Sequence, residues 1–149
     1  VVGASTGVVA GLVAITPAAG TVDILGAFVI GAASAVVCYF MVAVVKHKLK
    51  YDDSLDAFGV HGRGGISGSI LTGVFATTAI TGEGGYSGAL YGDWHQLWVQ
   101  IEGVLATIDY SAVLTFIILK LIDLVIGIRV EADDERMGLD LSQHGERVE

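Results

Sequence analysis

Residues 24–45 read ILGAFVIGAASAVVCYFMVAVV, and none of them is charged. A transmembrane helix needs about 20 consecutive, mainly apolar residues to cross the hydrocarbon core of a bilayer. Two further apolar runs, near residues 57–78 and 95–128, also reach that length. A run near residues 1–16 is shorter and ends before Pro17, because the residue before a proline is pushed out of the helical conformation. The sequence therefore predicts an all-α protein, a polytopic bundle of transmembrane helices.

The overall composition also indicates lipid surroundings. The chain has 149 residues, of which 53% are hydrophobic and 16% charged, and its mean hydropathy is +0.69. It contains 21 glycines and one proline without a period-three repeat, which excludes collagen and favours closely packed membrane helices. So many apolar residues demand burial, which excludes a disordered chain. Because the chain begins within an apolar stretch, we interpret it as the C-terminal part of a longer protein.

The distribution of charge predicts a topology. Lysines 46, 48 and 50 follow the second apolar run, whereas residues 79–93 contain acids but neither Lys nor Arg. The positive-inside rule places residues 46–55 in the cytoplasm. Successive spans then alternate in direction, so we expect a transmembrane region, residues 1–128, and a cytoplasmic C-terminal tail, residues 129–149, in a multi-pass protein of the plasma membrane or the bacterial inner membrane.

One ionisable side chain falls well inside a predicted span. His61 lies in the third apolar run, where an ionisable group is costly unless it faces a cavity or a partner. His61 has two possible interpretations, a functional residue or a buried histidine that only hydrogen-bonds a neighbouring helix. No second ligand accompanies it at metal-binding spacing, and Cys38 is most simply a small buried hydrophobe. The sequence shows no nucleophile elbow or phosphate-binding loop, so we expect no enzyme, no cofactor, no metal and no nucleic-acid partner.

Three groups of residues together carry a family resemblance. They are Gly7-Val8-Val9-Ala10-Gly11-Leu12-Val13-Ala14-Ile15-Thr16-Pro17-Ala18-Ala19-Gly20, then Asp52-Asp53-Ser54-Leu55-Asp56-Ala57-Phe58-Gly59-Val60-His61-Gly62, and finally Gly127-Ile128-Arg129-Val130 with Glu135-Arg136-Met137-Gly138-Leu139-Asp140 and His144-Gly145-Glu146. In this order they resemble the Amt/Mep/Rh family of ammonium transporters over essentially all 149 residues. The resemblance implies the last four of eleven spans. It also implies a homotrimer in which every subunit has its own narrow apolar pore lined by two histidines.

The resemblance assigns roles to several residues of the spans. His61 matches the second pore histidine. Thr6 and Thr16 match pore-side hydroxyl positions, although a threonine in a membrane helix more often bonds its own backbone. Asp53 and Asp56 match acidic positions near the cytoplasmic mouth, and their plainer role is to cap the third helix.

The tail resembles the family's cytoplasmic regulatory segment. Gly138, Leu139, Asp140 and Ser142 belong to it, and the resemblance implies docking under a neighbouring subunit, near the basic loop. Ser142 occupies a position that some relatives phosphorylate, and added charge beside several acids would repel. A PII-type regulatory protein is an implied partner if the source is prokaryotic.

The implied function is the transport of ammonium or ammonia across the cell membrane through a histidine-lined apolar pore surrounded by membrane lipid. The first histidine, the outer aromatic site and the phenylalanine gate belong to spans outside this chain, which alone should not conduct. An ammonium sensor and a non-conducting regulatory homologue are the alternatives. The transported species, whether ammonia, ammonium or ammonia with a separate proton, stays open.

Two charged residues depart from the family pattern. Arg63 replaces an apolar residue just after the histidine, and Asp109 replaces one in the middle of the last span. Because a lone arginine in a bilayer costs at least roughly 2.5–3.5 kcal/mol, we predict an intramembrane ion pair between the two. The alternative is that Arg63 snorkels or bonds backbone carbonyls while Asp109 is protonated.

Overall fold

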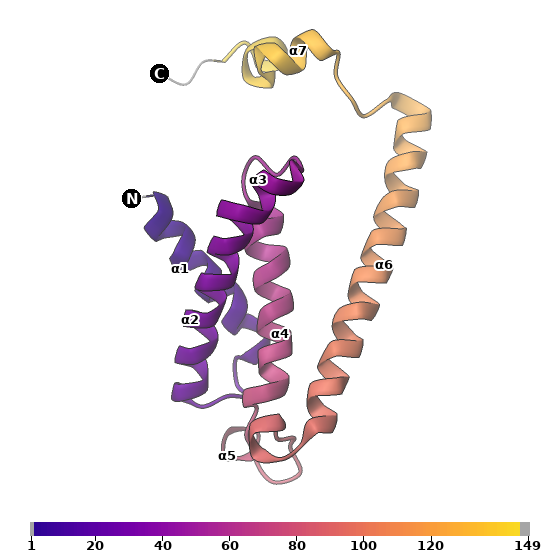
Figure 1. The fold of residues 1–149 in the computed structure, drawn as a ribbon. Coiled ribbons are helices and arrows are strands. Elements are labelled where there is room, and N and C mark those ends of the chain that lie inside the picture. The colour runs from indigo at the N-terminus through magenta and orange to yellow at the C-terminus, as the bar shows by residue number, and fades with distance from the viewer. Residues whose placement is uncertain (1, 147–149) are drawn as a thin grey trace. The chain divides into compact units, whose positions relative to one another are not determined.

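The structure is a computed structural model that describes residues 2–146, and its regular elements are helices, as Figure 1 shows. It divides into two compact units, Val1–Thr107 and Ile108–Glu149. The predicted all-α class is confirmed. The elements in chain order are α1 (Val2–Ile15), η1 (Thr16–Ala18), α2 (Ile24–Phe40), η2 (Met41–Val45), α3 (Lys46–Leu49), η3 (Phe58–Gly62), α4 (Arg63–Phe75), α5 (Thr78–Thr81), η4 (Ala89–Tyr91), α6 (Trp94–Ile126), α7 (Ala132–Met137) and η5 (Asp140–His144), of which η2, η3 and η5 are π-helical turns.

In the first unit, α1, α2 and α4 pack against one another around small side chains (Figure 1). Each helix contributes a buried stripe with a spacing of four residues, which is the spacing of one helix face. A Cβ atom added to Gly68 would lie 2.8 Å from the backbone Cα of Ala14, so the backbones of α1 and α4 are in direct contact there. The stripes are Ala10 and Ala14 on α1, continued by Ala18 on η1, then Ile30, Ser34 and Cys38 on α2, and Gly64, Gly68 and Thr72 on α4.

The ends of these helices follow from local capping. The Asp23 carboxylate accepts a hydrogen bond from the Gly26 N–H at 2.7 Å and so begins α2. Helix α4 ends at Phe75, earlier than the predicted end of the third span, because the Thr77 hydroxyl accepts from the Ala79 N–H and begins α5. Each cap satisfies an N–H group that the helix itself leaves unpaired.

Two helical stretches are long and apolar enough to cross a membrane. They are Ile24–Leu49, with 26 residues and a mean hydropathy of 2.5, and Trp94–Ile126, with 33 residues and a mean hydropathy of 1.8. The stretch Gly3–Ala18 is apolar but shorter. By this criterion the structure supports two of the four predicted spans, and the other two stay predictions.

The second unit contains the C-terminal part of α6 followed by α7 and η5. Gly127, with φ of 71°, ends α6 in the left-handed conformation that glycine adopts most readily. Arg129 donates to the Glu135 carboxylate at 3.1 Å, an exposed ion pair that links the residues after α6 to α7.

Candidate functional site

His61 lies within the π-helical turn η3, at the start of the helical stretch that continues as α4. Turns of this kind are rare and frequently occur at functional sites. The neighbouring residues Val60 and Gly64 are buried, whereas His61 is exposed. The imidazole therefore lies on a part of the turn that α1 and α2 do not cover.

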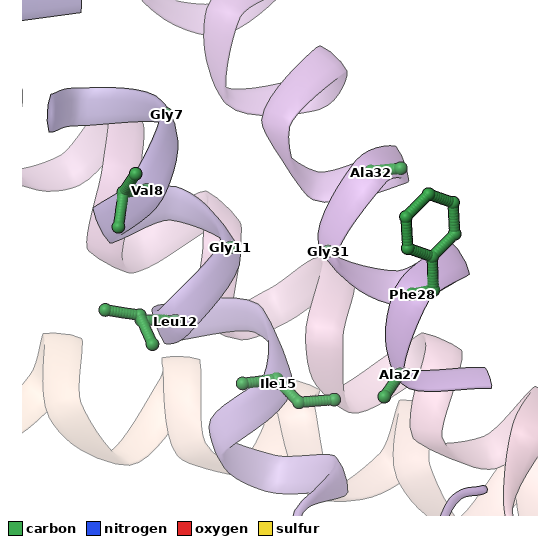
Figure 2. Close-up of a pocket in the computed structure, with 9 residues that line it drawn as sticks. All are labelled: Gly7, Val8, Gly11, Leu12, Ile15, Ala27, Phe28, Gly31 and Ala32. Atoms are coloured by element: carbon green, nitrogen blue, oxygen red, sulfur yellow. The ribbon is translucent and has the colours of Figure 1, made fainter. Parts of the chain in front are cut away.

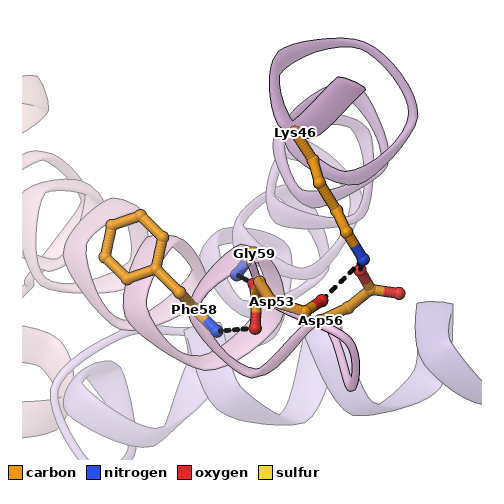
Figure 3. Close-up of polar contacts among 5 residues, drawn as sticks. All are labelled: Lys46, Asp53, Asp56, Phe58 and Gly59. Atoms are coloured by element: carbon orange, nitrogen blue, oxygen red, sulfur yellow. Dashed lines mark hydrogen bonds and ion pairs between the residues drawn. The ribbon is translucent and has the colours of Figure 1, made fainter. Parts of the chain in front are cut away.

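The N-terminal end of this turn is capped by Asp53 (Figure 3). Its carboxylate accepts from the Gly59 N–H at 3.0 Å and from the Phe58 N–H at 3.2 Å. Partial burial would by itself raise the pKa of this carboxyl, but the backbone N–H groups of Gly59, Phe58 and Ala57, together with Lys46, outweigh it, so the pKa lies below its usual value. Asp53 thus caps the helix as an anion.

Lys46 joins the end of the second predicted span to the beginning of the third. Its ammonium group donates to the Asp56 carboxylate at 2.6 Å and to the Asp53 backbone carbonyl at 2.6 Å (Figure 3). Asp56 has φ of 55°, a left-handed conformation that aspartate tolerates better than most residues. The two acids therefore have different roles, since Asp53 caps the turn and Asp56 pairs with Lys46.

A buried polar contact supports the turn from the side of α2. The Cys38 thiol points its weak donor at the Val60 carbonyl, with 3.7 Å between Sγ and O. One turn earlier on α2, the Ser34 hydroxyl donates to the Ala10 carbonyl of α1 at 3.3 Å. The contact with Val60 gives Cys38 a role in addition to that of the small buried hydrophobe predicted from the sequence.

Arg63 stacks on an aromatic ring of the same helical stretch. Its guanidinium carbon lies 5.5 Å from the centroid of the Phe58 ring, and the edge-to-face contact of Tyr51 with Phe58 has a centroid distance of 6.1 Å. The Nε atom of Arg63 is buried and has no hydrogen-bond partner among residues 2–146. Arg63 belongs to the first unit and Asp109 to the second, so their ion pair stays a prediction.

Both predicted threonine positions lie on or directly after α1. The Thr16 hydroxyl donates to the Leu12 carbonyl four residues earlier, at 2.8 Å, which is the local backbone bond that threonine often makes in helices. Thr6 is partly buried within α1. The pore-lining role of the two hydroxyls stays a prediction.

The predicted regulatory segment folds locally in the second unit. Gly138, with φ of 95°, separates α7 from η5, which begins at Asp140 directly after Leu139. The Ser142 hydroxyl donates to the Gly138 carbonyl at 3.1 Å and to the Asp134 carbonyl at 3.4 Å. A phosphate on Ser142 would remove this donor and place negative charge beside carbonyl oxygens.

A shallow apolar groove lies between α1 and α2 (Figure 2). Its volume is about 460 Å³, and none of the side chains that line it could bind an ion or exchange a proton. No residue that lines the groove belongs to the candidate site around His61, so the groove is a separate feature. Its lining residues are Gly7, Val8, Gly11, Leu12, Ile15, Ala27, Phe28, Gly31 and Ala32.

Sequence reasoning missed two of the contacts at this site. The signal for the Lys46 pair is a lysine directly after an apolar run, with acids following in the same loop. The Cys38 contact has no such signal, because it depends on the crossing of α2 with η3. Within residues 2–146, the structure contains no group of three or more His, Cys, Asp or Glu side chains that could hold a metal ion.

Comparisons with known proteins all find similarity to ammonium transporters. Residues 1–149 match the Ammonium Transporter Family. An ammonium transporter of Aquifex aeolicus is 56% identical over 148 residues, which are 99% of this chain and 34% of that protein. One from Bacillus subtilis is 45% identical over 146 residues, 98% of this chain and 36% of that protein.

A similar result comes from solved structures. The crystal structure of Saccharomyces cerevisiae Mep2 is similar with a TM-score of 0.78 and 35% identity, over 86% of this chain and 30% of that one. The chain therefore spans about a third of the length of the proteins it matches.

Proposed function

Because the chain belongs to the ammonium transporter family, we propose that it forms the C-terminal four spans of a pore for ammonium or ammonia and that His61 lines this pore. The family is one of membrane transporters and is not enzymatic. The segments near residues 1–16, 24–45, 57–78 and 95–128 are the four spans of this proposal.

The observation that carries the proposal is the exposure of His61 beside two buried neighbours, Val60 and Gly64. An imidazole inside a bilayer is costly unless it lies in a cavity or against a polar partner. Here α1 and α2 leave it uncovered, which is what a pore on that side requires. A neutral imidazole has one donor and one acceptor, so it can exchange protons with a passing ammonium or ammonia molecule.

The proposed topology places residues 46–55 and the tail, residues 129–149, in the cytoplasm. The protein is then a multi-pass homotrimer of the cell membrane, surrounded by lipid. The tail is proposed to dock under a neighbouring subunit and to accept a PII-type regulator. Since Lys46 is already paired with Asp56, the charges left for the tail would be Lys48 and Lys50.

Transport by the intact protein tests the pore assignment. Replacing His61→Gln keeps a hydrogen-bonding side chain of similar size but removes the group that exchanges protons, so we expect the rate of ammonium uptake to fall by at least about tenfold. His95→Gln is the matched control, because His95 is exposed at the beginning of α6.

The readout is uptake of labelled methylammonium and of ammonium by proteoliposomes. Unchanged rates and unchanged selectivity in His61→Gln would refute the pore role of His61. A parent protein that binds ammonium but transports none would favour the sensor alternative instead.

A further inference from the structure

The turn that carries His61 is held by a side chain from another helix. Lys46, on α3, contacts the loop before η3 at two points, the Asp53 carbonyl and the Asp56 carboxylate, both at 2.6 Å. The lysine side chain is 22% exposed and that of Asp56 is 31% exposed, so the pair is partly shielded from water. A contact of this kind restrains the loop more than a fully exposed ion pair, which is worth little.

We propose that Lys46 is a positioning residue for transport, which acts by fixing the backbone of the turn that presents His61 to the pore. This inference rests on the proposed pore role of His61. Lys46 does not touch the substrate in this scheme, and its effect passes through Asp56 and Val60.

The first step of the argument is the backbone connection from Asp56 to His61. The Asp56 carbonyl accepts from the Val60 N–H at 2.8 Å, and Val60 directly precedes His61. Asp56 itself has the left-handed φ of 55° at the entry to the turn. A shift of Asp56 therefore moves the first hydrogen bonds of the turn and with them the direction of the imidazole.

The second step is that Val60 is held from its other side as well. Its carbonyl lies 3.7 Å from the Cys38 thiol of α2, and its side chain is buried in the cluster with Ala10 and Cys38. A β-carbon added to the neighbouring Gly59 would lie 2.8 Å from a methyl group of Val42, so the turn sits directly on η2. With its side fixed by packing, the turn is held at its loop end by the Asp53 cap and by Lys46, which contacts both Asp53 and Asp56.

The third step is the contrast with the other lysines of this loop. Lys48 and Lys50 are exposed and lie outside the ion pair. They provide the same positive charge to the cytoplasmic surface as Lys46. Removing any of the three lysines would thus weaken a general electrostatic attraction of ammonium. Among the three, only removal of Lys46 would change the position of His61.

The experiment is a double-mutant cycle in the intact transporter. The single variants are Lys46→Met, which keeps an unbranched side chain but removes its donors, and His61→Gln. The third variant combines both. Lys46→Arg is the conservative rescue, and Lys48→Met is the matched control. The readouts are KM and maximal rate of methylammonium and ammonium uptake in proteoliposomes with equal amounts of trimer.

Lys46→Met is expected to lower the maximal rate by a factor of roughly three to ten with little change in KM, because small misplacements of a reacting group are costly. Lys46→Arg should retain at least half of the parent rate, and Lys48→Met should match the parent. In the His61→Gln background, Lys46→Met should have almost no further effect, because its action passes through the missing imidazole.

Multiplicative effects of the two substitutions would overturn the inference while leaving the pore role of His61 intact. A parent-like rate in Lys46→Met would overturn it as well. If His61→Gln transports like the parent, the proposed function itself fails, so the two failures are distinguishable. Asp56→Asn keeps a residue that tolerates a positive φ but removes the charge, and it should lower the maximal rate less than Lys46→Met, because Lys46 retains its bond to the Asp53 carbonyl.

Discussion

Substitution of Gly68 by alanine should separate the contribution of helix packing from that of helix propensity. An added Cβ at Gly68 would lie 2.8 Å from both the Cα and the carbonyl carbon of Ala14, and it would lie closer still to the carbonyl oxygen. Ordinary contacts begin at 3.4 Å, so α1 and α4 would have to move apart by at least 0.6 Å (3.4 minus 2.8). No rotamer change can absorb this overlap because the opposing atoms belong to the backbone.

The magnitude follows from two opposing contributions. Alanine favours a helix over glycine by about 1 kcal/mol, and overpacking in a close-packed interior costs typically 1–3 kcal/mol or more. Gly65 supplies the matched control, since no atom of a neighbouring element lies within 4 Å of its added Cβ. Gly65→Ala should therefore stabilise the protein slightly, whereas Gly68→Ala should be less stable than Gly65→Ala by roughly 1–3 kcal/mol.

Thermal unfolding of the detergent-solubilised transporter measures the difference between the two variants. Adding Ala14→Gly to Gly68→Ala should not restore stability, because the overlap involves the backbone of residue 14 and not its methyl group. The reasoning is refuted if Gly68→Ala melts at or above the temperature of Gly65→Ala, or if Ala14→Gly rescues it.

Three other predictions concern charged and modifiable groups. Because the pKa of Asp53 is lowered from 3.8 in the folded protein, its carboxylate stabilises the fold above that pH and the stabilisation is lost as pH falls through the folded-state pKa. Asp53→Asn should accordingly be less stable at neutral pH and lose less stability on acidification below about pH 4 in an acid-unfolding titration. Removing either Arg63 or Asp109 should lower the melting temperature, and exchanging the two residues should recover it; additive losses without recovery would argue against the ion pair. Ser142→Asp should change the transport rate while Ser142→Ala has a smaller effect, and identical uptake by both variants and the parent would count against a phosphorylation switch.

The sequence was sufficient for the fold class and for the family. Apolar runs of about 20 residues predicted helices, and the family resemblance is confirmed by the match over residues 1–149 and by 56% identity to the Aquifex aeolicus transporter. Of the two acids expected to cap the third helix, Asp53 and Asp56, the structure of residues 2–146 shows cap contacts for Asp53 only, and the Asp56 carboxylate pairs with Lys46. These features depend on local composition and on short spacings, which a sequence displays directly.

The features that could not be predicted from the sequence depend on which helix faces pack against one another. On α4, Gly68 makes a close contact with the alanine stripe of α1 that includes Ala14. The glycines of α1 do not take part equally, since an added Cβ at Gly3 or Gly7 meets no atom within 4 Å. Helix spacing alone cannot say which of two small-residue faces is covered. The stacking of Arg63 on Phe58 likewise depends on the π turn, since it brings together residues five positions apart.

Because residues 58–62 form a π turn, the site also depends on the number of residues in this turn. Deleting one residue there would allow ordinary α-helical bonding, and the segment before the deletion would rotate by about 100° and advance by about 1.5 Å relative to α4. Asp56 and Lys46 would then hold a different face of the helix toward the pore, even if the deleted residue were Gly62 and every side chain of the site were still present. Insertions and deletions in this turn should therefore be far less tolerated than substitutions, and the interval from Asp56 to His61 is as much a part of the site as the residues themselves.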